Sequence, residues 1–236
     1  MRGKLRANDA LRKIEIIKNV NTYAEGSCLI KCGNTHVLCT ASVDSHLPDW
    51  LKNEEKGWVT AEYNLLPRST TTRVGREKTL NSGRTHEIKR LIGRSLRAVV
   101  DLEKLKGFQI TLDCDVLQAD GGTRTASVTG AFVALYLACE KMVSGGLIPR
   151  LPIKEYVAAV SCGVSGGEVL LDLDYDEDSS ADVDSNFVIT ESGKLVEIQG
   201  TAEGEPFTDE TLKQLLSMAK RGVSELISEQ KKVIRS

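Results

Sequence analysis

The sequence predicts an α+β fold in which two halves, each running from several strands to a long helix, form one compact domain. Short segments in which apolar and polar residues alternate, as in half-buried strands, occur in both halves. A long segment of helix-forming residues follows the strands in each half. The chain has 236 residues, 41% of them hydrophobic, which suffices for a sizeable core. We therefore expect a first half over 1–146 and a second half over 147–236.

In the first half, strands are expected at five places. Alternation and turn signals put them at 14–19, 26–32, 36–43, 57–63 and 110–116. The Gly33-Asn34 turn between the second and third segments predicts a hairpin. A helix is expected from about Thr85, where apolar residues recur at helical spacing, and another over 126–143. The latter segment is apolar on most faces, which predicts a buried helix.

The second half also runs from several strands to a long helix. Its strands are expected at 156–163, 168–173, 182–190 and 195–199, with turns at Gly166-Gly167 and Ser192-Gly193. Thr208-Asp209-Glu210 caps a final amphipathic helix. The shared order indicates a duplicated α+β unit, although the identities between the halves are too few to establish duplication.

The junction between the strand at 110–116 and the helix at 126–143 holds Gly121-Gly122-Thr123-Arg124. Two glycines let the backbone turn sharply and let a ligand approach it. The first turn of a helix has N–H groups without intrahelical acceptors, and Arg124 adds a full positive charge. Such a junction is suited to a phosphate-like anion. The alternative is a tight turn in which Thr123 or Thr125 is the N-cap.

Composition and charge exclude several classes of protein. The net charge of −2 gives the whole molecule no attraction for nucleic acid or membrane, so any such attraction is local. The N-terminus lacks an apolar signal-peptide core, and the longest apolar run, 131–139, is far shorter than the ~18 residues of a membrane span. We expect a cytoplasmic protein. The six cysteines and three histidines show no metal-ligand spacing, so buried reduced thiols and surface or packing histidines are expected.

The stretch from Arg68 to Arg97 is strongly basic. It contains nine lysines and arginines against two glutamates, a local charge of +7. A polar loop at 69–72 lies within it, and the following helix carries Lys89, Arg90, Arg94 and Arg97 on its outer face. Such a stretch can follow the phosphates of a nucleic acid or face a neighbouring subunit. For Lys89 and Arg97 a solvated basic face is an equally good interpretation.

An acidic stretch from Glu168 to Asp184 contains eight carboxylates and no basic residue. It is not an EF-hand, because counting from Asp172 the positions that need Gly and Glu hold Glu177 and Val183. A solvated acidic turn accounts for most of these residues. We single out Asp178 and Asp184, expected at the end of one strand and the start of the next. Such a pair suits Mg²⁺, which takes one or two carboxylates and fills its shell with water and substrate phosphates.

No Walker motif and no G-x-G-x-x-G motif accompanies these features. Six motifs in order nevertheless closely resemble the ribonuclease PH family. They are GWVTAEY at 57–63, LPR at 66–68, SGRT at 82–85, RLIGR at 90–94, QADGGTRT at 118–125 and EDSSA at 177–181. The resemblance extends from about Leu11 to Lys231.

The resemblance implies a phosphate-dependent 3′-to-5′ exoribonuclease, or tRNA nucleotidyltransferase, that trims tRNA precursors. It implies the ribonuclease PH fold (ribosomal protein S5 domain 2-like), shared with polynucleotide phosphorylase and exosome ring subunits, and a homohexameric ring built as a trimer of dimers. Its phosphate-binding positions correspond to four residues, here called the phosphate cradle: Arg84, Gly122, Thr123 and Arg124. Asp178 and Asp184 correspond to its catalytic, metal-associated carboxylates. The residues implicated in holding RNA, here called the loop arginines, correspond to Arg68, Arg73 and Arg76.

On this basis inorganic phosphate is the expected co-substrate and Mg²⁺ the expected cofactor. Two departures from the family pattern are visible, at Lys4-Leu5-Arg6 with Arg12-Lys13-Ile14 and in a slightly short loop between Arg76 and Ser82. One alternative is a non-catalytic RNA-binding ring subunit of the same fold, which would lack the cradle or the carboxylates. Another is a small-molecule phosphotransferase, which would not need the loop arginines.

Overall fold

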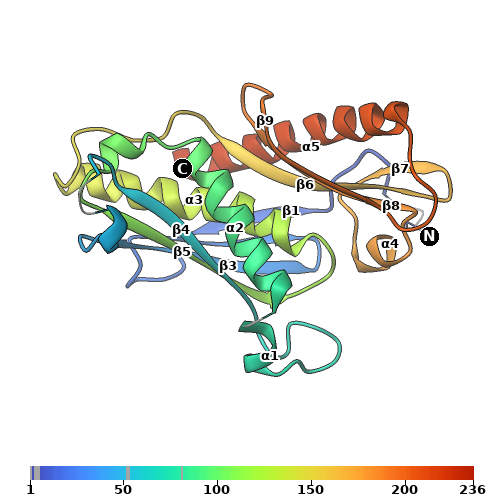
Figure 1. Ribbon diagram of the computed structural model, residues 1–236, viewed down its shortest axis with the longest axis horizontal. Coiled ribbons are helices and arrows are strands. Elements are labelled where there is room, and N and C mark those ends of the chain that lie inside the picture. Colours follow the sequence, from blue (N-terminus) through green and yellow to red (C-terminus); the bar gives the residue numbers. More distant parts are fainter. Residues whose placement is uncertain (1, 3–5, 52–53, 81) are drawn as a thin grey trace.

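The structure is a computed structural model that describes residues 2, 6–51, 54–80 and 82–236. It is an α+β fold, as predicted, with two β-sheets and helices packed between and over them (Figure 1). The first sheet has the strand order β1-β2-β3-β5-β4, in which only β4 and β5 pair in parallel. Its strands are β1 (Ile14–Lys18), β2 (Gly26–Cys32), β3 (Thr35–Asp44), β4 (Trp58–Leu65) and β5 (Gln109–Gln118).

One face of the first sheet is buried because alternate residues of each strand point to it. Cys28, Cys39 and Cys114 lie side by side across β2, β3 and β5 on this face and are buried. Hydrogen bonding to Cys114 and Cys28, together with burial, raises the pKa of the Cys39 thiol well above its usual value. All six cysteines are buried and free, which confirms the expectation of reduced structural thiols.

The second sheet has the order β7-β6-β8-β9, and all its neighbours are antiparallel. Its strands are β6 (Val157–Ser165), β7 (Glu168–Leu171), β8 (Val183–Thr190) and β9 (Leu195–Ala202). The sequence predicted these strands and the hairpin of β2 and β3, with ends that differ by a few residues. Alternation is a strong signal here because each strand faces the core on one side.

The buried helix α3 (Thr123–Ser144) lies between the two sheets. A Cβ atom at Gly130 would stand 2.7 Å from Cγ2 of Ile30 and 2.8 Å from Sγ of Cys39, so glycine lets α3 approach the first sheet closely. On its other side, Thr129 Oγ1 accepts a hydrogen bond of 3.1 Å from the Ala159 N–H of β6. Among the described residues α3 alone has the length and composition of a membrane span, and 72% of its apolar window is buried inside the fold.

Two further long helices cover the sheets. The basic helix α2 (Gly83–Ala98) begins after Ser82, whose Oγ accepts from the Thr85 N–H at 3.1 Å, and it packs on β4. The final helix α5 (Asp209–Arg235) begins after Thr208, as predicted, and packs on β6. Gln230 of α5 is fully buried and donates to the Thr129 carbonyl of α3 at 2.9 Å. The two helices that end the halves therefore contact each other.

The short helices were not predicted, because one turn is too short to show a periodic pattern. They are the 3₁₀ segments at Asp49–Leu51 and Leu102–Leu105 and the α-helices α1 (Arg76–Leu80) and α4 (Tyr175–Ser179). The expectation that Asp178 ends a strand is wrong, because Asp178 lies on α4. A reciprocal cap starts this helix: Asp174 accepts from the Glu177 N–H at 3.0 Å, and Glu177 accepts from the Asp174 N–H at 3.1 Å. Asp184 lies at the start of β8, as predicted.

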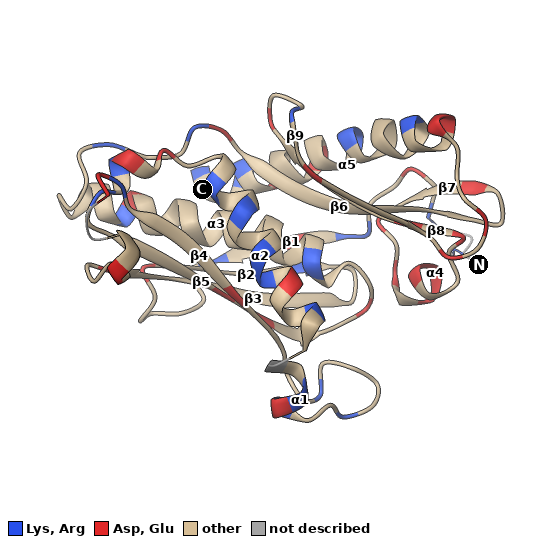
Figure 2. Cartoon of the chain, in the orientation of Figure 1, with Lys and Arg blue, Asp and Glu red and all other residues tan. Residues whose placement is uncertain are grey.

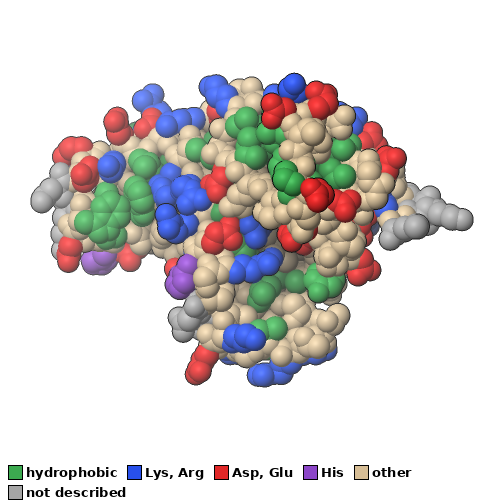
Figure 3. All heavy atoms as spheres, turned by 45° about the vertical axis from the view of Figure 1, so that its right-hand side comes forward, with side chains coloured by type: hydrophobic (Ala, Val, Ile, Leu, Met, Phe, Trp, Pro, Cys, Tyr) green, Lys and Arg blue, Asp and Glu red, His purple; other side chains and the backbone are tan. Residues whose placement is uncertain are grey.

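The chain between β4 and α2 projects from the body of the molecule as a lobe that includes α1 (Figure 1). We call its described residues 66–80 the basic lobe. Figure 2 shows that basic residues lie along this lobe and along α2, whereas α4 is acidic. The space-filling view shows basic groups on the lobe and on the body above it (Figure 3).

Candidate active site

The turn between β5 and α3 lies in the first half of the chain and packs against the segment that leads into α4 in the second half. Gly121 and Gly122 have φ angles of 70° and 62°, in the left-handed region that residues with a side chain rarely adopt. A Cβ atom at Gly121 would stand 2.5 Å from the carbonyl carbon of Asp174 and 2.6 Å from the carbonyl oxygen of Leu173. Glycine therefore lets the start of α3 lie directly against the start of α4.

The start of α3 has the features of an anion site. Gly122 is the N-cap residue, and no side chain caps the helix. The first intrahelical bond runs from the Ala126 N–H to the Gly122 carbonyl at 3.0 Å, so the preceding N–H groups of the helix lack intrahelical acceptors. The alternative cap by Thr123 or Thr125 is wrong. Thr125 Oγ1 donates to the Gly122 carbonyl at 2.9 Å, and Thr123 Oγ1 pairs with the Tyr63 hydroxyl at 2.8 Å.

The members of the phosphate cradle gather around Tyr63. Burial raises the pKa of the Tyr63 hydroxyl, and this rise is opposed by the hydrogen bond with Thr123 and by the positive charges of Arg84 and Arg124. Both guanidinium groups therefore lie near Tyr63 and the start of α3. Arg84, in the first turn of α2, is exposed, and within the described residues its guanidinium has no hydrogen-bond or ion-pair partner.

Arg124 is held from two sides. Its Nη1 donates to Glu87 Oε1 of α2 at 3.0 Å and to Gln199 Oε1 of β9 at 2.6 Å. The Arg124 side chain is 18% exposed, so most of it is shielded while part remains open to a ligand. Its charge also lowers the pKa of Asp184, so Arg124 acts electrostatically on the candidate carboxylate pair.

Asp178 of α4 and Asp184 of β8 form a close carboxylate pair. Burial and then the charge of Asp178 raise the pKa of Asp184 to about 6, and Glu203 adds a smaller rise. Asp184 Oδ1 is buried and has no hydrogen-bond partner. A buried carboxylate oxygen without a partner is unfavourable unless a ligand binds it. Binding of a cation or a proton at this carboxylate pair would therefore be favourable.

The ligand chemistry of the carboxylate pair matches what Mg²⁺ requires. The described residues contain no group of three or more His, Cys, Asp or Glu side chains with metal-site geometry. Mg²⁺ usually binds one or two carboxylates and keeps several waters or substrate phosphates, so it does not need a third protein ligand. The unpartnered oxygen of Asp184 beside Asp178 fits such a cation.

The N-terminal segment packs against the glycine turn and α4. Arg12 donates through Nη2 to Asp172 Oδ1 at 2.7 Å and through its backbone N–H to Asp172 Oδ2 at 2.8 Å, and both side chains are almost fully buried. The Arg12 Nη2 atom lies 3.0 Å from where a Cβ of Gly122 would be. Arg6 pairs with Glu177 of α4 at 2.5 Å. Of the departures from the family pattern, Lys4 and Leu5 lie outside the described residues.

Within the described residues no hydrogen bond or ion pair joins the loop arginines to the phosphate cradle. Arg68, Arg73 and Arg76 are exposed on the basic lobe, and Arg68 donates to the Thr71 carbonyl at 3.0 Å within it. Arg76 lies near the foot of the lobe, where its charge lowers the pKa of Asp115 against the larger effect of burial. The three side chains are thus exposed to solvent on the basic lobe.

The basic face of α2 is largely paired within the chain. Lys89 pairs with Glu62, and Arg94 forms a two-pronged pair with Glu197 at 2.8 and 3.0 Å. Arg97 donates to the Val59 carbonyl at 2.8 Å and lies 4.4 Å above the Trp58 ring. Lys89, Arg94 and Arg97 therefore hold α2 against β4 and β9.

Several residues of the site escaped sequence reasoning. Four residues that contact members of the phosphate cradle or the glycine turn were given no role from the sequence: Glu87, Gln199, Tyr63 and Arg12. Tyr63 ends the GWVTAEY motif and Glu87 is an acidic residue in a basic helix, so these two had a visible signal. The partners of Glu87 come from distant parts of the chain, which no local pattern indicates.

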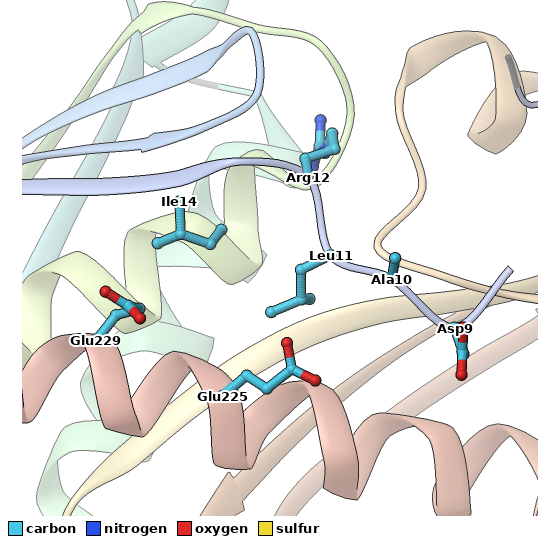
Figure 4. A pocket seen from close by; sticks show the side chains of 7 residues that line it. All are labelled: Asp9, Ala10, Leu11, Arg12, Ile14, Glu225 and Glu229. Atoms are coloured by element: carbon cyan, nitrogen blue, oxygen red, sulfur yellow. The ribbon is translucent and has the colours of Figure 1, made fainter. Parts of the chain in front are cut away.

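A large surface hollow lies elsewhere, between the N-terminal segment and α5. It has a volume of about 510 Å³ and is lined by Asp9, Glu225 and Glu229 above an apolar floor. Figure 4 shows Leu11 and Ile14 directed toward α5, whereas Arg12 points away from it. Carboxylates repel phosphates, so this hollow does not suit RNA.

The fold defines an α+β protein with two β-sheets. Domain 1 of the 3′ exoribonuclease family matches residues 10–139, and domain 2 of the same family matches residues 155–222. The chain therefore belongs to the 3′ exoribonuclease family.

Within this family the chain is similar to ribonuclease PH. It is 57% identical over 236 residues to ribonuclease PH of Methylocella silvestris, covering 99% of this chain and 100% of that protein. It is also 57% identical over 231 residues to ribonuclease PH of Neisseria meningitidis, covering 97% and 96% of the two chains.

Solved structures of other proteins share the fold. The Archaeoglobus fulgidus exosome with RNA bound to the active site matches with a TM-score of 0.80 and 25% identity, over 95% of this chain and 90% of the other. Rrp46 of rice (Oryza sativa) matches with a TM-score of 0.79 and 19% identity, over 99% and 100% of the two chains, which supports the fold alone.

Proposed function

We propose that the chain is a phosphate-dependent 3′-to-5′ exoribonuclease that trims tRNA precursors and releases nucleoside diphosphates. The observation that carries this proposal is that an anion site and a carboxylate pair occur together in the same region of the fold. The uncapped start of α3 with Arg124 provides an anion site, and the charge of Arg124 reaches the carboxylate of Asp184. Phosphoryl transfer needs positioned charge more than covalent catalysis.

Inorganic phosphate is the co-substrate, and the phosphate cradle is its proposed site. Arg84 has no partner within the described residues, which leaves its whole guanidinium group for an anion. The N–H groups at the start of α3 add oriented donors. Tyr63 fixes the Thr123 hydroxyl at 2.8 Å, so that side chain is held in place before phosphate arrives.

The proposed reaction is a displacement at phosphorus, and no atom changes its oxidation state. An oxygen of hydrogen phosphate forms a bond to the phosphorus of the last phosphodiester. The bond from that phosphorus to the 3′ oxygen of the preceding nucleotide breaks, and this oxygen takes the proton of the attacking phosphate. The products are a nucleoside 5′-diphosphate and an RNA one nucleotide shorter, and the reverse reaction adds a nucleotide.

Asp178 and Asp184 are the proposed catalytic carboxylates and the proposed ligands of Mg²⁺. When bound, Mg²⁺ would offset the negative charge that phosphate and RNA bring together. The support for this role is the buried, unpartnered Oδ1 of Asp184 next to Asp178.

We also propose that the loop arginines hold the body of the tRNA and that the chain works in the cytoplasm as a homohexamer, a trimer of dimers. In this arrangement residues 1–146 supply the cradle and the basic lobe, and residues 147–236 supply the carboxylates. The exposed position of Arg68, Arg73 and Arg76 supports the first role. Light scattering tests the assembly, because a stable and fully active monomer would exclude the ring.

A non-catalytic ring subunit is the less favoured function, since this chain keeps both the cradle and the carboxylate pair. The two functions are distinguished by incubating the protein with a 3′-extended precursor tRNA, once with phosphate and once without it. Shortening that requires phosphate and yields nucleoside diphosphates supports the enzyme. No shortening in either condition, with binding intact, would instead support the binding subunit.

A further inference from the structure

Four polar side chains outside the phosphate cradle form a hydrogen-bonded network that ends at Arg124. They are Glu87, Arg94, Glu197 and Gln199. Arg124 Nη1 donates to Gln199 Oε1 at 2.6 Å and to Glu87 Oε1 at 3.0 Å. Gln199 Nε2 donates to that same oxygen of Glu87 at 2.9 Å and to Glu197 Oε1 at 3.1 Å. Glu197 is in turn fixed by Arg94. Gln199 therefore stands at the point where β9 meets α2 and α3.

The chemistry of these neighbours calls for an amide at position 199. The acceptor end of Gln199 faces a guanidinium group, and its donor end faces the carboxylates of Glu87 and Glu197. Among side chains of this length only an amide offers an acceptor and a donor at once. A glutamate would bring a third negative charge against two others, and leucine would satisfy none of the three groups.

Gln199 also limits how Glu87 pairs with Arg124. A carboxylate and a guanidinium group prefer a two-pronged pair, in which both oxygens accept. Here Glu87 uses one oxygen, Oε1, for both Arg124 and Gln199. Only Nη1 of Arg124 is engaged by the described residues, so its Nε and Nη2 donors remain for another ligand.

We propose that Gln199 is a positioning residue for the phosphate co-substrate. It holds Arg124 by Nη1 and occupies Glu87, so that Glu87 does not capture the guanidinium group in a two-pronged pair. The free donors of Arg124 then face the incoming phosphate beside the start of α3. The proposal rests on the proposed role of Arg124 in binding phosphate.

The test is the Gln199→Leu variant, with steady-state kinetics measured separately for phosphate and for a 3′-extended tRNA. Loss of Gln199 frees Glu87 to pair fully with Arg124. The KM for phosphate should rise about tenfold or more, the size expected for a charge-assisted hydrogen bond, while the KM for tRNA stays unchanged. Adding Glu87→Gln to this variant removes the competing carboxylate and should restore most of the phosphate KM.

The double variant separates positioning from a merely structural bridge. If the network only held β9 against α2, removing two of its members would do more harm than removing one. A Glu87→Gln/Gln199→Leu protein that is no better than Gln199→Leu would therefore overturn the proposal, as would an unchanged phosphate KM in Gln199→Leu. Gln214→Leu, a change at an exposed glutamine of α5, is the matched control.

Two further measurements make the result decisive. Thermal melting identifies a folding defect, and Gln199→Met, which keeps the length of the side chain, replaces Gln199→Leu if the latter is unstable. Arg124→Ala is measured in parallel. If Arg124→Ala binds phosphate normally, the proposed function fails and the Gln199 proposal fails with it. If Arg124→Ala is impaired and neither Gln199 variant is, only the Gln199 proposal fails.

Discussion

The backbone of Gly121 packs directly against the backbone of Asp174, so that a Cβ on Gly121 would lie 2.5 Å from the Asp174 carbonyl carbon. This contact joins the turn before α3 to the cap of α4, and with them the phosphate cradle to Asp178. Real Cβ atoms essentially never come this close to a backbone carbon, so the two segments must separate if the glycine is replaced.

Gly121→Ala is therefore expected to reduce phosphorolysis strongly, by separating the cradle from the carboxylates. Left-handed strain alone contributes about 1–3 kcal/mol of destabilisation. Gly193→Ala is the matched control, because Gly193 also has a positive φ, 79°, but has open space around its Cβ position. Thermal melting and turnover are measured on both variants. Equal turnover in the two would contradict the packing account.

Asp178→Asn and Asp184→Asn should each abolish phosphorolysis while leaving tRNA binding nearly unchanged, since the carboxylates act on chemistry more than on docking. Turnover is measured as a function of Mg²⁺ concentration, and binding by filter retention. Residual activity that recovers at high Mg²⁺ would support a ligand role. Normal turnover in both variants would assign these residues to a solvated acidic surface.

Replacing Arg68, Arg73 and Arg76 with alanine should weaken binding of precursor tRNA and reduce its salt dependence, because each arginine that neutralises an RNA phosphate releases counterions. Cleavage of a very short RNA should not change, since no hydrogen bond or ion pair within the described residues joins the loop arginines to the phosphate cradle. Alanine at Lys213, Lys220 and Lys232 of α5, all exposed, removes the same charge elsewhere. Equal affinity and salt slope in wild type and the loop variant would exclude the RNA role.

Asp113 on the outer face of β5 gives a prediction about stability and pH. Burial, followed by the charges of Asp115 and Glu62, raises the pKa of Asp113 above its ordinary value of 3.8. The folded protein therefore keeps this proton at a pH where the unfolded chain has lost it, and stability falls as pH rises from about 3.8 through the folded pKa.

Asp113→Asn removes this loss of stability. The variant should therefore have a higher melting temperature than wild type at neutral pH, and the difference should be smaller at acidic pH. Asp44→Asn should do the opposite at neutral pH, because hydrogen bonds from the backbone and side chain of His46 lower the pKa of Asp44. Melting curves from pH 3.5 to 7.5 check both signs. A lower melting temperature for Asp113→Asn at neutral pH would contradict the electrostatic account.

The sequence predicted the elements whose burial repeats regularly along the chain. Alternation located the nine strands of the described residues to within a few positions, and the apolar composition of 126–143 identified α3 as buried. α1 and α4 were missed because a single turn has no period, and Asp178 was consequently placed at a strand end. The division into 1–146 and 147–236 and the roles of the site residues stay predictions.

The interactions that hold Arg124 could not be predicted from local sequence patterns. Gln199 is 112 residues from Glu87 and 75 from Arg124, and their contact depends on how β9 packs over α2 and α3. A glutamine in a strand has no signature of function. Sequence motifs identified the groups that could touch phosphate, whereas only the packed structure identified the groups that orient them.

The most direct test of the account is the transfer of radiolabelled inorganic phosphate into nucleoside diphosphate from a 3′-extended tRNA. Wild-type protein should incorporate the label into every nucleotide that it releases. Arg84→Ala and Arg124→Ala should each need roughly 30- to 150-fold more phosphate, as expected for the loss of about 2–3 kcal/mol from a charge-assisted contact. Release of unlabelled nucleoside monophosphate by wild-type protein, or normal phosphate dependence in both variants, would contradict the central claim.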